Sequence, residues 1–400
     1  MPFIELLFNA IAIFYAFRAI QLLREVWSTR ATLRQPPLTR KQKQIAEGIA
    51  FYVAIPPGVF IHELGHALFV LAFGGEILRF RVYGYWGFVE HIGSYTAFES
   101  WFIALAGTLG SLLYSAALWA WASRQEAPFY RYAGLRSVRF HIYFTLIYYP
   151  LFTLATQFGD WRTIYDFGTV PGPAAVTLVA HALLLGGFYW LDRRGGFVMP
   201  HFKTAAEAAQ FTALRDRAAA QPGDAALQLA YAEQLINRGL AGQAEPLLQR
   251  AAENQSGSAE LYLLLARAEM DGSGRPGRKA IANLEKALAL GLRNPEQQIA
   301  VRRTLAEHAF EKGKAAEAMV YLDRCIDEVR ARPEISPALA RACHQTRGVV
   351  RRQTGRYAEA EEDLRQALHF AQLEGNSAVV SSLEQELAVL DNHRQQRQRL

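Results

Sequence analysis

The sequence predicts an all-α protein in two parts: a polytopic membrane domain with a short β-hairpin, followed by an α-solenoid of helical hairpins. Long apolar runs and all seven tryptophans lie in residues 1–200. Residues 201–400 are instead rich in Ala, Leu, Glu, Gln and Arg at helical spacing. The mean hydropathy of +0.00 is therefore the average of two unlike halves. We expect 1–200 and 201–400 to form separate domains.

Five apolar stretches approach the roughly 20 residues that a helix needs to cross a bilayer. They cover approximately residues 3–23, 48–73, 101–122, 141–158 and 173–191. Most tryptophans lie near the ends of these stretches, as expected for rings at a membrane interface. We expect the first stretch to be a retained helix and not a signal peptide. Glu5 and Arg18 interrupt it, and no small-residue cleavage site is followed by a soluble segment.

The basic residues predict an orientation in the membrane. Lys and Arg are concentrated between Arg24 and Lys43, between the third and fourth stretches, and directly after the fifth. The positive-inside rule places these regions in the cytoplasm, with the N-terminus outside and residues 201–400 cytosolic. Because nothing indicates an organelle signal, we expect a bacterial inner membrane.

Two classes of function find little support in the composition. The net charge is only +6, and the arginines do not form one stripe with interleaved aromatics, so we expect no nucleic-acid binding. Cys325 and Cys343 lack the paired spacing of a disulfide framework or a cysteine metal site. We expect both to be buried free thiols.

The second apolar stretch contains His62-Glu63-Leu64-Gly65-His66. Residues four apart share one face of a helix, so both imidazoles can bind one Zn²⁺ while Glu63 serves as general base. Ionisable groups are costly inside a membrane span, which favours a metal site over histidines satisfied by interhelical hydrogen bonds. Pro56-Pro57-Gly58, just upstream, either opens the backbone beside the site or forms the first turn of a broken helix.

A catalytic zinc takes three protein ligands, so a third donor must come from elsewhere in residues 1–200. The best candidate is Asp160, at the end of the fourth stretch. Its alternative role is to cap the turn that starts at Trp161. The competing donors are Glu90, His91, His141, Asp166 and His181.

Residues 76–83 predict a β-strand. Leu78, Phe80 and Val82 alternate with Arg79 and Arg81, and glycines follow. A period of two indicates a strand and a hairpin.

The second half contains a repeated pattern of small residues spaced twelve and then seven positions apart. The copies are Ala232, Ala244 and Ala251; Ala306, Ala318 and Cys325; Gly348, Ala360 and Ala367; and a distorted copy with Ala280 and Ala287. Gly239, Gly313 and Gly355 occupy the same position within three of the copies. In the distorted copy, the segment Gly272–Gly277 lengthens the turn between the two helices. The spacing resembles tetratricopeptide repeats and predicts four hairpins. Their groove would bind a protein or peptide, or the array would steady or dimerise the protein.

Together these features resemble the site-2 protease group of intramembrane metalloproteases, the M50 peptidase family, over roughly residues 45–190. The resemblance rests on His62–His66, Gly74-Gly75 with its strand, the small residues 106–111, and Gly159-Asp160. It implies zinc on His62, His66 and Asp160, with Glu63 as catalytic base. It also implies a hairpin that holds unwound substrate, and the opposite orientation of the zinc helix, with the repeats outside the cytoplasm.

The leading hypothesis is an intramembrane zinc metalloendopeptidase. It would cut single-span membrane proteins or remnant signal peptides in the bilayer, with the repeats recruiting substrate or partner. The alternatives are a membrane-anchored tetratricopeptide scaffold with a vestigial or structural metal site, and a lipid hydrolase. Intact Glu63 argues against the scaffold, and the strand hairpin favours proteolysis over lipid hydrolysis.

Overall fold

The protein is described by a computed structural model that covers residues 2–156, 158–254, 257–270 and 276–398. The chain divides into two compact units. We call residues 1–220 with 237–243 the membrane unit, and residues 221–236 with 244–400 the repeat unit. Each is described by itself.

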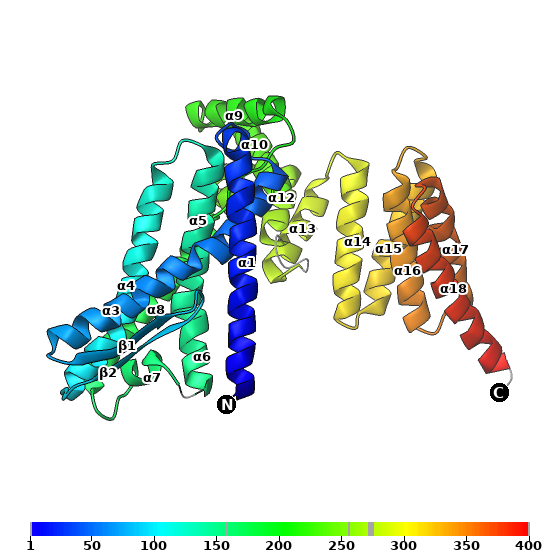
Figure 1. Ribbon diagram of the computed structural model, residues 1–400. Helices are drawn as coiled ribbons and strands as arrows, with labels where there is room; N and C mark the ends of the chain where they lie inside the picture. The colour runs from blue at the N-terminus through cyan, green and yellow to red at the C-terminus, as the bar shows by residue number, and fades with distance from the viewer. Residues whose placement is uncertain (1, 157, 255–256, 271–275, 399–400) are drawn as a thin grey trace. The chain divides into compact units, whose positions relative to one another are not determined.

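The membrane unit is built from helices and one two-stranded sheet (Figure 1). Its helical elements are α1 (Pro2–Leu33), α2 (Arg40–Gly48), the π-helical turn η1 (Ile49–Val53), α3 (Ile55–Ala72), α4 (Ala97–Ser123), α5 (Pro128–Tyr143), the π-helical turn η2 (Phe144–Tyr148), α6 (Tyr149–Thr156), α7 (Asp160–Ile164), α8 (Pro171–Arg193) and α9 (Ala205–Ala220). Every predicted apolar stretch falls on one or more of these elements.

Three helical runs in the described part of the chain are long and apolar enough to cross a membrane. They are Arg40–Ala72, Ala97–Ser123 and Pro171–Arg193. These runs correspond to the second, third and fifth predicted stretches. Spans by α1 and by the run through α5, η2 and α6 stay predictions.

The helix that carries the His-Glu motif begins at Ile55, directly after the π-helical turn η1 and Ala54. Pro56 and Pro57 lie in the first turn of α3, where a missing N–H removes no helical hydrogen bond. The prolines therefore start a new helix, which is the second of the two interpretations above. His62 lies within the regular part of α3.

The predicted hairpin is present and follows α3 directly. Strand β1 (Glu76–Val82) pairs antiparallel with β2 (Gly87–Ile92), with Phe80 opposite Val89. Gly74 has a φ of 76°, which lets the chain turn out of α3 without the strain that a Cβ would add there.

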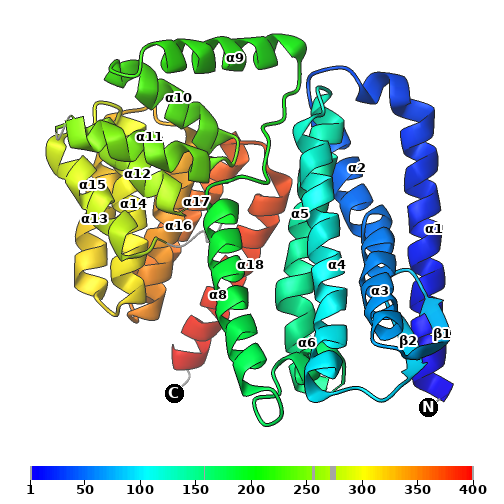
Figure 2. The ribbon, with the colours of Figure 1, turned by 90° about the vertical axis from the view of Figure 1, so that its left-hand side faces the viewer.

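The predicted cytoplasmic segments meet at one end of the membrane unit, which we call the basic end. Leu33, Leu38 and Ile45 pack with Phe129 and Tyr132 in one buried cluster. Figure 2 shows the C-terminal ends of α1 and α4 at this end and the β1–β2 hairpin at the opposite end. The fold thus gathers the basic loops on one side, as the positive-inside pattern requires.

The repeat unit is a stack of helices. They are α10 (Ala225–Asn237), α11 (Ala241–Asn254), α12 (Ala259–Met270), α13 (Arg278–Leu290), α14 (Pro295–Glu311), α15 (Ala315–Ala331), α16 (Pro337–Gln353), α17 (Tyr357–Leu373) and α18 (Ser377–Gln398). Helices α12 and α13, α14 and α15, and α16 and α17 pack as pairs, and α18 packs on α17. The first sequence copy corresponds to α10 and α11.

The predicted small residues are buried in the repeat unit. Nine of them are at most 1% exposed: Ala232, Ala244, Ala280, Ala287, Ala306, Ala318, Cys325, Ala360 and Ala367. Gly239, Gly313 and Gly355 have φ of 70°, 77° and 82°, the left-handed conformation that ends a helix. Of the stretched turn predicted at Gly272–Gly277, residues 272–275 lie outside the described residues.

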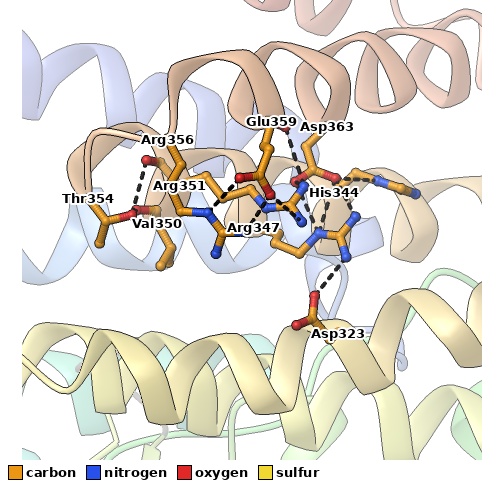
Figure 3. A network of polar contacts seen from close by, with 9 residues as sticks. All are labelled: Asp323, His344, Arg347, Val350, Arg351, Thr354, Arg356, Glu359 and Asp363. Atoms are coloured by element: carbon orange, nitrogen blue, oxygen red, sulfur yellow. Dashed lines mark hydrogen bonds and ion pairs between the residues drawn. The ribbon is translucent and has the colours of Figure 1, made fainter.

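A buried network of charges joins α15, α16 and α17 (Figure 3). Asp363, 1% exposed, accepts hydrogen bonds from Arg347 Nη2 at 2.7 Å and from Arg351 Nη1 at 2.7 Å. Its Oδ1 lies 3.1 Å from His344 Nδ1, and Arg347 also reaches Asp323 at 2.8 Å. Beside this network, Cys325 and Cys343 are free and buried, as predicted.

Candidate metal centre

The His-Glu motif places two imidazoles on one face of α3. His62 and His66 approach each other with their Nε2 atoms 3.1 Å apart. His66 Nδ1 donates a hydrogen bond to the carbonyl oxygen of Ile103 at 2.7 Å, and His62 Nδ1 lies 3.1 Å from Ser111 Oγ. A carbonyl oxygen only accepts, so the neutral His66 ring keeps its proton on Nδ1 and presents the Nε2 lone pair. Helix α4 thereby fixes the orientation of both rings.

Glycines on α3 and α4 allow this close approach. A Cβ at Gly107 would lie 2.3 Å from His66 Nε2 and 2.7 Å from His62 Nε2. A Cβ at Gly65 would lie 2.4 Å from the Ala106 carbonyl oxygen. Small residues at such crossings let the backbones of membrane helices pack closely. Sequence reasoning noted the small residues 106–111 but did not assign Gly107 to the site.

Asp160, the first residue of α7, completes the group. Its Oδ2 lies 3.1 Å from His62 Nε2 and 3.2 Å from His66 Nε2. Gly159, with a φ of 116°, turns the chain into α7 and takes the N-cap position, so Asp160 is the first residue of the helix. The fully buried Trp161 and Ile164 pack on Ala104 of α4 and anchor this short helix.

A tyrosine that sequence reasoning missed holds the aspartate. Tyr149 donates its hydroxyl hydrogen to Asp160 Oδ2 across 2.8 Å. Its ring lies edge-on to that of His62, with centroids 5.6 Å apart. Tyr149 stands eleven residues before Asp160, and no local spacing signals the contact.

The competing donors are placed elsewhere. Among the described residues, the group that could hold a metal consists of His62, His66 and Asp160. Glu90 pairs with Arg79 and His91 with Tyr95, Asp166 closes a turn with Thr169, and His181 binds Tyr165 and the Leu146 carbonyl. His141 lines the cavity described below.

The three donor atoms fit a zinc ion. They lie within 4.8 Å of one another, with pairwise separations of 3.1, 3.1 and 3.2 Å. A tetrahedral zinc with bonds of about 2.0 to 2.1 Å requires separations of roughly 3.3 to 3.4 Å. Adjustments of a few tenths of an ångström therefore suffice. Two imidazoles and one carboxylate also form a donor set of catalytic zinc sites, which keep a fourth position open.

Glu63 lies beside this group and against the hairpin. The side chain is 6% exposed, and a Cβ at Gly87 of β2 would lie 2.7 Å from Glu63 Cγ and 2.9 Å from Oε1. Gly87 is thus the point where the hairpin passes over the predicted base.

A cavity of about 630 Å³ opens from the site into the membrane unit. His62, Glu63 and Ser111 lie in its wall. Its other walls are largely aromatic and include Tyr15, Tyr52, Tyr85, Phe140, Phe144 and Tyr148. Such walls suit an apolar guest.

Comparison with known families agrees with this geometry. The family model for Peptidase M50B-like proteins matches residues 55–165. This segment is M50B-like. It contains the motif on α3, the glycines of α4, the hairpin and Asp160. The M50B-like segment thus includes every predicted site residue.

Other comparisons are weaker. No curated protein sequence matches the chain. Two crystal structures of MamA are similar at 19% and 20% identity, covering 41% and 47% of this chain and 88% and 93% of theirs, each with a TM-score of 0.33. A STAND signal-transduction ATPase with a tetratricopeptide repeat sensor from Pyrococcus horikoshii is 12% identical, covering 88% of this chain and 54% of its own, with a TM-score of 0.37. TM-scores this low do not establish a shared fold.

Proposed function

We propose that the chain is an intramembrane zinc metalloendopeptidase that hydrolyses peptide bonds of membrane-spanning substrates. One observation carries the proposal: His62, His66 and Asp160 converge beside Glu63 at an apolar cavity, and both histidines lie on a helical run of membrane length. The M50B-like segment, which covers these residues, points to the same class of enzyme.

Each site residue has a chemical role in this proposal. His62 Nε2, His66 Nε2 and Asp160 Oδ2 hold Zn²⁺, which when bound supplies Lewis-acid polarisation of a water and of the scissile carbonyl. The Glu63 carboxylate accepts the proton of the attacking water and returns it to the departing amine. Tyr149, Ser111 and the Ile103 carbonyl keep the ligands oriented.

The hairpin supplies a means of holding the substrate. A transmembrane helix hides its amides in its own hydrogen bonds, so the segment to be cut must unwind first. Among the described residues the sheet has two strands, so β1 and β2 each pair along one side only. An extended segment can add to an open strand edge, and Gly87 brings the sheet against Glu63.

The remaining parts of the proposal concern location and recruitment. The basic end faces the cytoplasm of a bacterial cell, with the chain integral to the inner membrane. The repeat unit is cytoplasmic and recruits the substrate, a single-span membrane protein or remnant signal peptide, or a protein partner.

The test is cleavage of candidate single-span substrates by purified, detergent-solubilised, zinc-loaded protein. Wild type is expected to cut at least one substrate within its apolar segment, and Glu63→Gln is expected to lose cleavage while keeping zinc. Equal cleavage by Glu63→Gln would overturn the assignment of the base and of the enzyme class.

A further inference from the structure

His141 of α5 is a buried histidine that the chemistry above does not use. It is 2% exposed, and neither ring nitrogen has a hydrogen-bond partner among the described residues. His141 is one of the residues that line the cavity, together with His62 and Glu63.

Two neighbouring helices fix the position of this ring. A Cβ at Gly58 of α3 would lie 2.1 Å from His141 Cε1 and 2.8 Å from each ring nitrogen, so the imidazole rests on the α3 backbone. Tyr114 of α4 packs edge-on to it, with ring centroids 5.0 Å apart at 83°. Gly58 stands four residues before His62, on the same face of α3 and about 6 Å away along the helix axis.

Other buried histidines have partners. His66 donates to the Ile103 carbonyl, His181 contacts Tyr165 and the Leu146 carbonyl, and His344 lies beside Asp363. Burying a polar group without a partner is unfavourable, and most such groups in folded proteins are hydrogen-bonded. The position of His141 in the cavity wall indicates that the occupant of the cavity supplies its partner.

We propose that His141 binds the backbone of the substrate segment that is being cleaved. A neutral imidazole carries one donor and one acceptor, which match the C=O and N–H of an extended peptide. The His141 ring lies about 6 Å from His62 along α3, and an extended chain advances about 3.3 Å per residue. For a substrate segment that runs along α3 with its scissile bond beside His62, the ring therefore meets the backbone roughly two residues from that bond. His141 is thus a residue that positions the unwound segment. This inference rests on the proposed function.

The test compares two hydroxamate probes on zinc-loaded, full-length protein in detergent. Acetohydroxamate contains only the zinc-binding group, whereas an N-acyl dipeptide hydroxamate adds a peptide backbone to it. The readout is the affinity for the dipeptide hydroxamate divided by the affinity for acetohydroxamate, both measured by calorimetry. Any change in the zinc site itself affects both affinities and cancels in this ratio. The variants are His141→Phe, which removes the hydrogen bonds, and His141→Gln, which keeps a donor and an acceptor. His181→Asn is the matched control, a buried histidine with partners outside the cavity wall.

His141→Phe is expected to lower the affinity ratio about tenfold, the effect of losing one or two hydrogen bonds. His141→Gln is expected to restore part of it, and His181→Asn to leave it unchanged. An unchanged ratio in His141→Phe, or a loss of zinc from that variant, would overturn the role of His141 while leaving the peptidase proposal in place. If zinc-supplied wild type binds neither hydroxamate, the proposed function itself fails.

Discussion

Tyr149 and Asp160 share a hydrogen bond of 2.8 Å to the same Oδ2 that faces both imidazoles. The hydroxyl fixes which carboxylate oxygen points at the metal position and restrains its rotation. Partners of this kind are worth about 10- to 100-fold in metal affinity.

The first prediction therefore concerns Tyr149→Phe, which removes the hydroxyl and keeps the ring. We expect zinc affinity to fall about 10- to 100-fold. Competition with a chromophoric chelator measures it. Tyr148→Phe is the control, since Tyr148 lines the same cavity but is 54% exposed. Equal zinc affinity in wild type and Tyr149→Phe would show that the hydroxyl does not support the ligand.

The second prediction concerns Gly107. Gly107→Ala places a methyl group 2.3 Å from His66 Nε2 and 2.7 Å from His62 Nε2. Both imidazole rings must therefore move away from the position where the metal would bind. We expect this variant to lose most of its bound zinc and its peptidase activity. Gly186→Ala on α8 is the control, because a Cβ there meets nothing within 4 Å. Full zinc content in Gly107→Ala would contradict the described packing of α4 on the site.

The third prediction separates catalysis from metal binding through the hairpin. A Cβ at Gly87 would meet Glu63 Cγ at 2.7 Å, while the zinc-binding group lies on α3 and α7. Gly87→Ala is expected to lower cleavage at least tenfold through displaced Glu63, and to keep the zinc content of wild type. Gly172→Ala, where a Cβ has open space, serves as control. Loss of zinc together with activity would mean that the hairpin supports the ligands and not the base.

The fourth prediction concerns the repeat unit. Burial alone raises the pKa of Asp363, but hydrogen bonds from His344 and Arg347 outweigh it and hold the pKa below its usual value. Because the folded-state pKa is depressed, charged Asp363 stabilises the protein fully at pH values above the ordinary pKa of about 3.9. This stabilisation is lost as the pH falls through the folded-state pKa. Asp363→Asn leaves Arg347 and Arg351 without their buried partner and should cost about 3 to 5 kcal/mol.

Hydrogen exchange of α16 and α17 amides in the full chain measures that effect. We expect faster exchange in Asp363→Asn at neutral pH and a smaller difference from wild type below the folded-state pKa. Asp327→Asn, at an exposed position of α15, is the control. Equal protection at neutral pH would show that the network contributes little to the packing of these helices.

The sequence was informative where helical or strand periodicity decides the outcome. The spacing of His62 and His66 places them on one face of any helix, and the alternation at residues 76–83 predicts a strand wherever it packs. The small residues of the repeats were equally readable, because each must fit a close helix crossing. Asp160 was a candidate through its chain position and the family resemblance, and the structure brings it to the histidines.

The remaining features of the site depend on tertiary packing, which the spacing of residues in the sequence does not reveal. Gly107 matters because α4 crosses α3 at that level, and Tyr149 because α6 and α7 fold back on each other. His141 was one of several possible zinc donors in the sequence. Its actual place, against Gly58 and outside the metal group, required the arrangement of three helices. Pro56 and Pro57 left two interpretations open until the start of α3 was known.

Zinc content is the measurement that tests the central claim most directly. Protein purified with zinc supplied, then dialysed and analysed by mass spectrometry, is predicted to hold about one zinc per chain. Glu63→Gln is expected to keep that zinc, and Asp160→Ala to lose most of it. A wild type without zinc, or an Asp160→Ala variant that holds as much zinc as wild type, would contradict the metal centre described above.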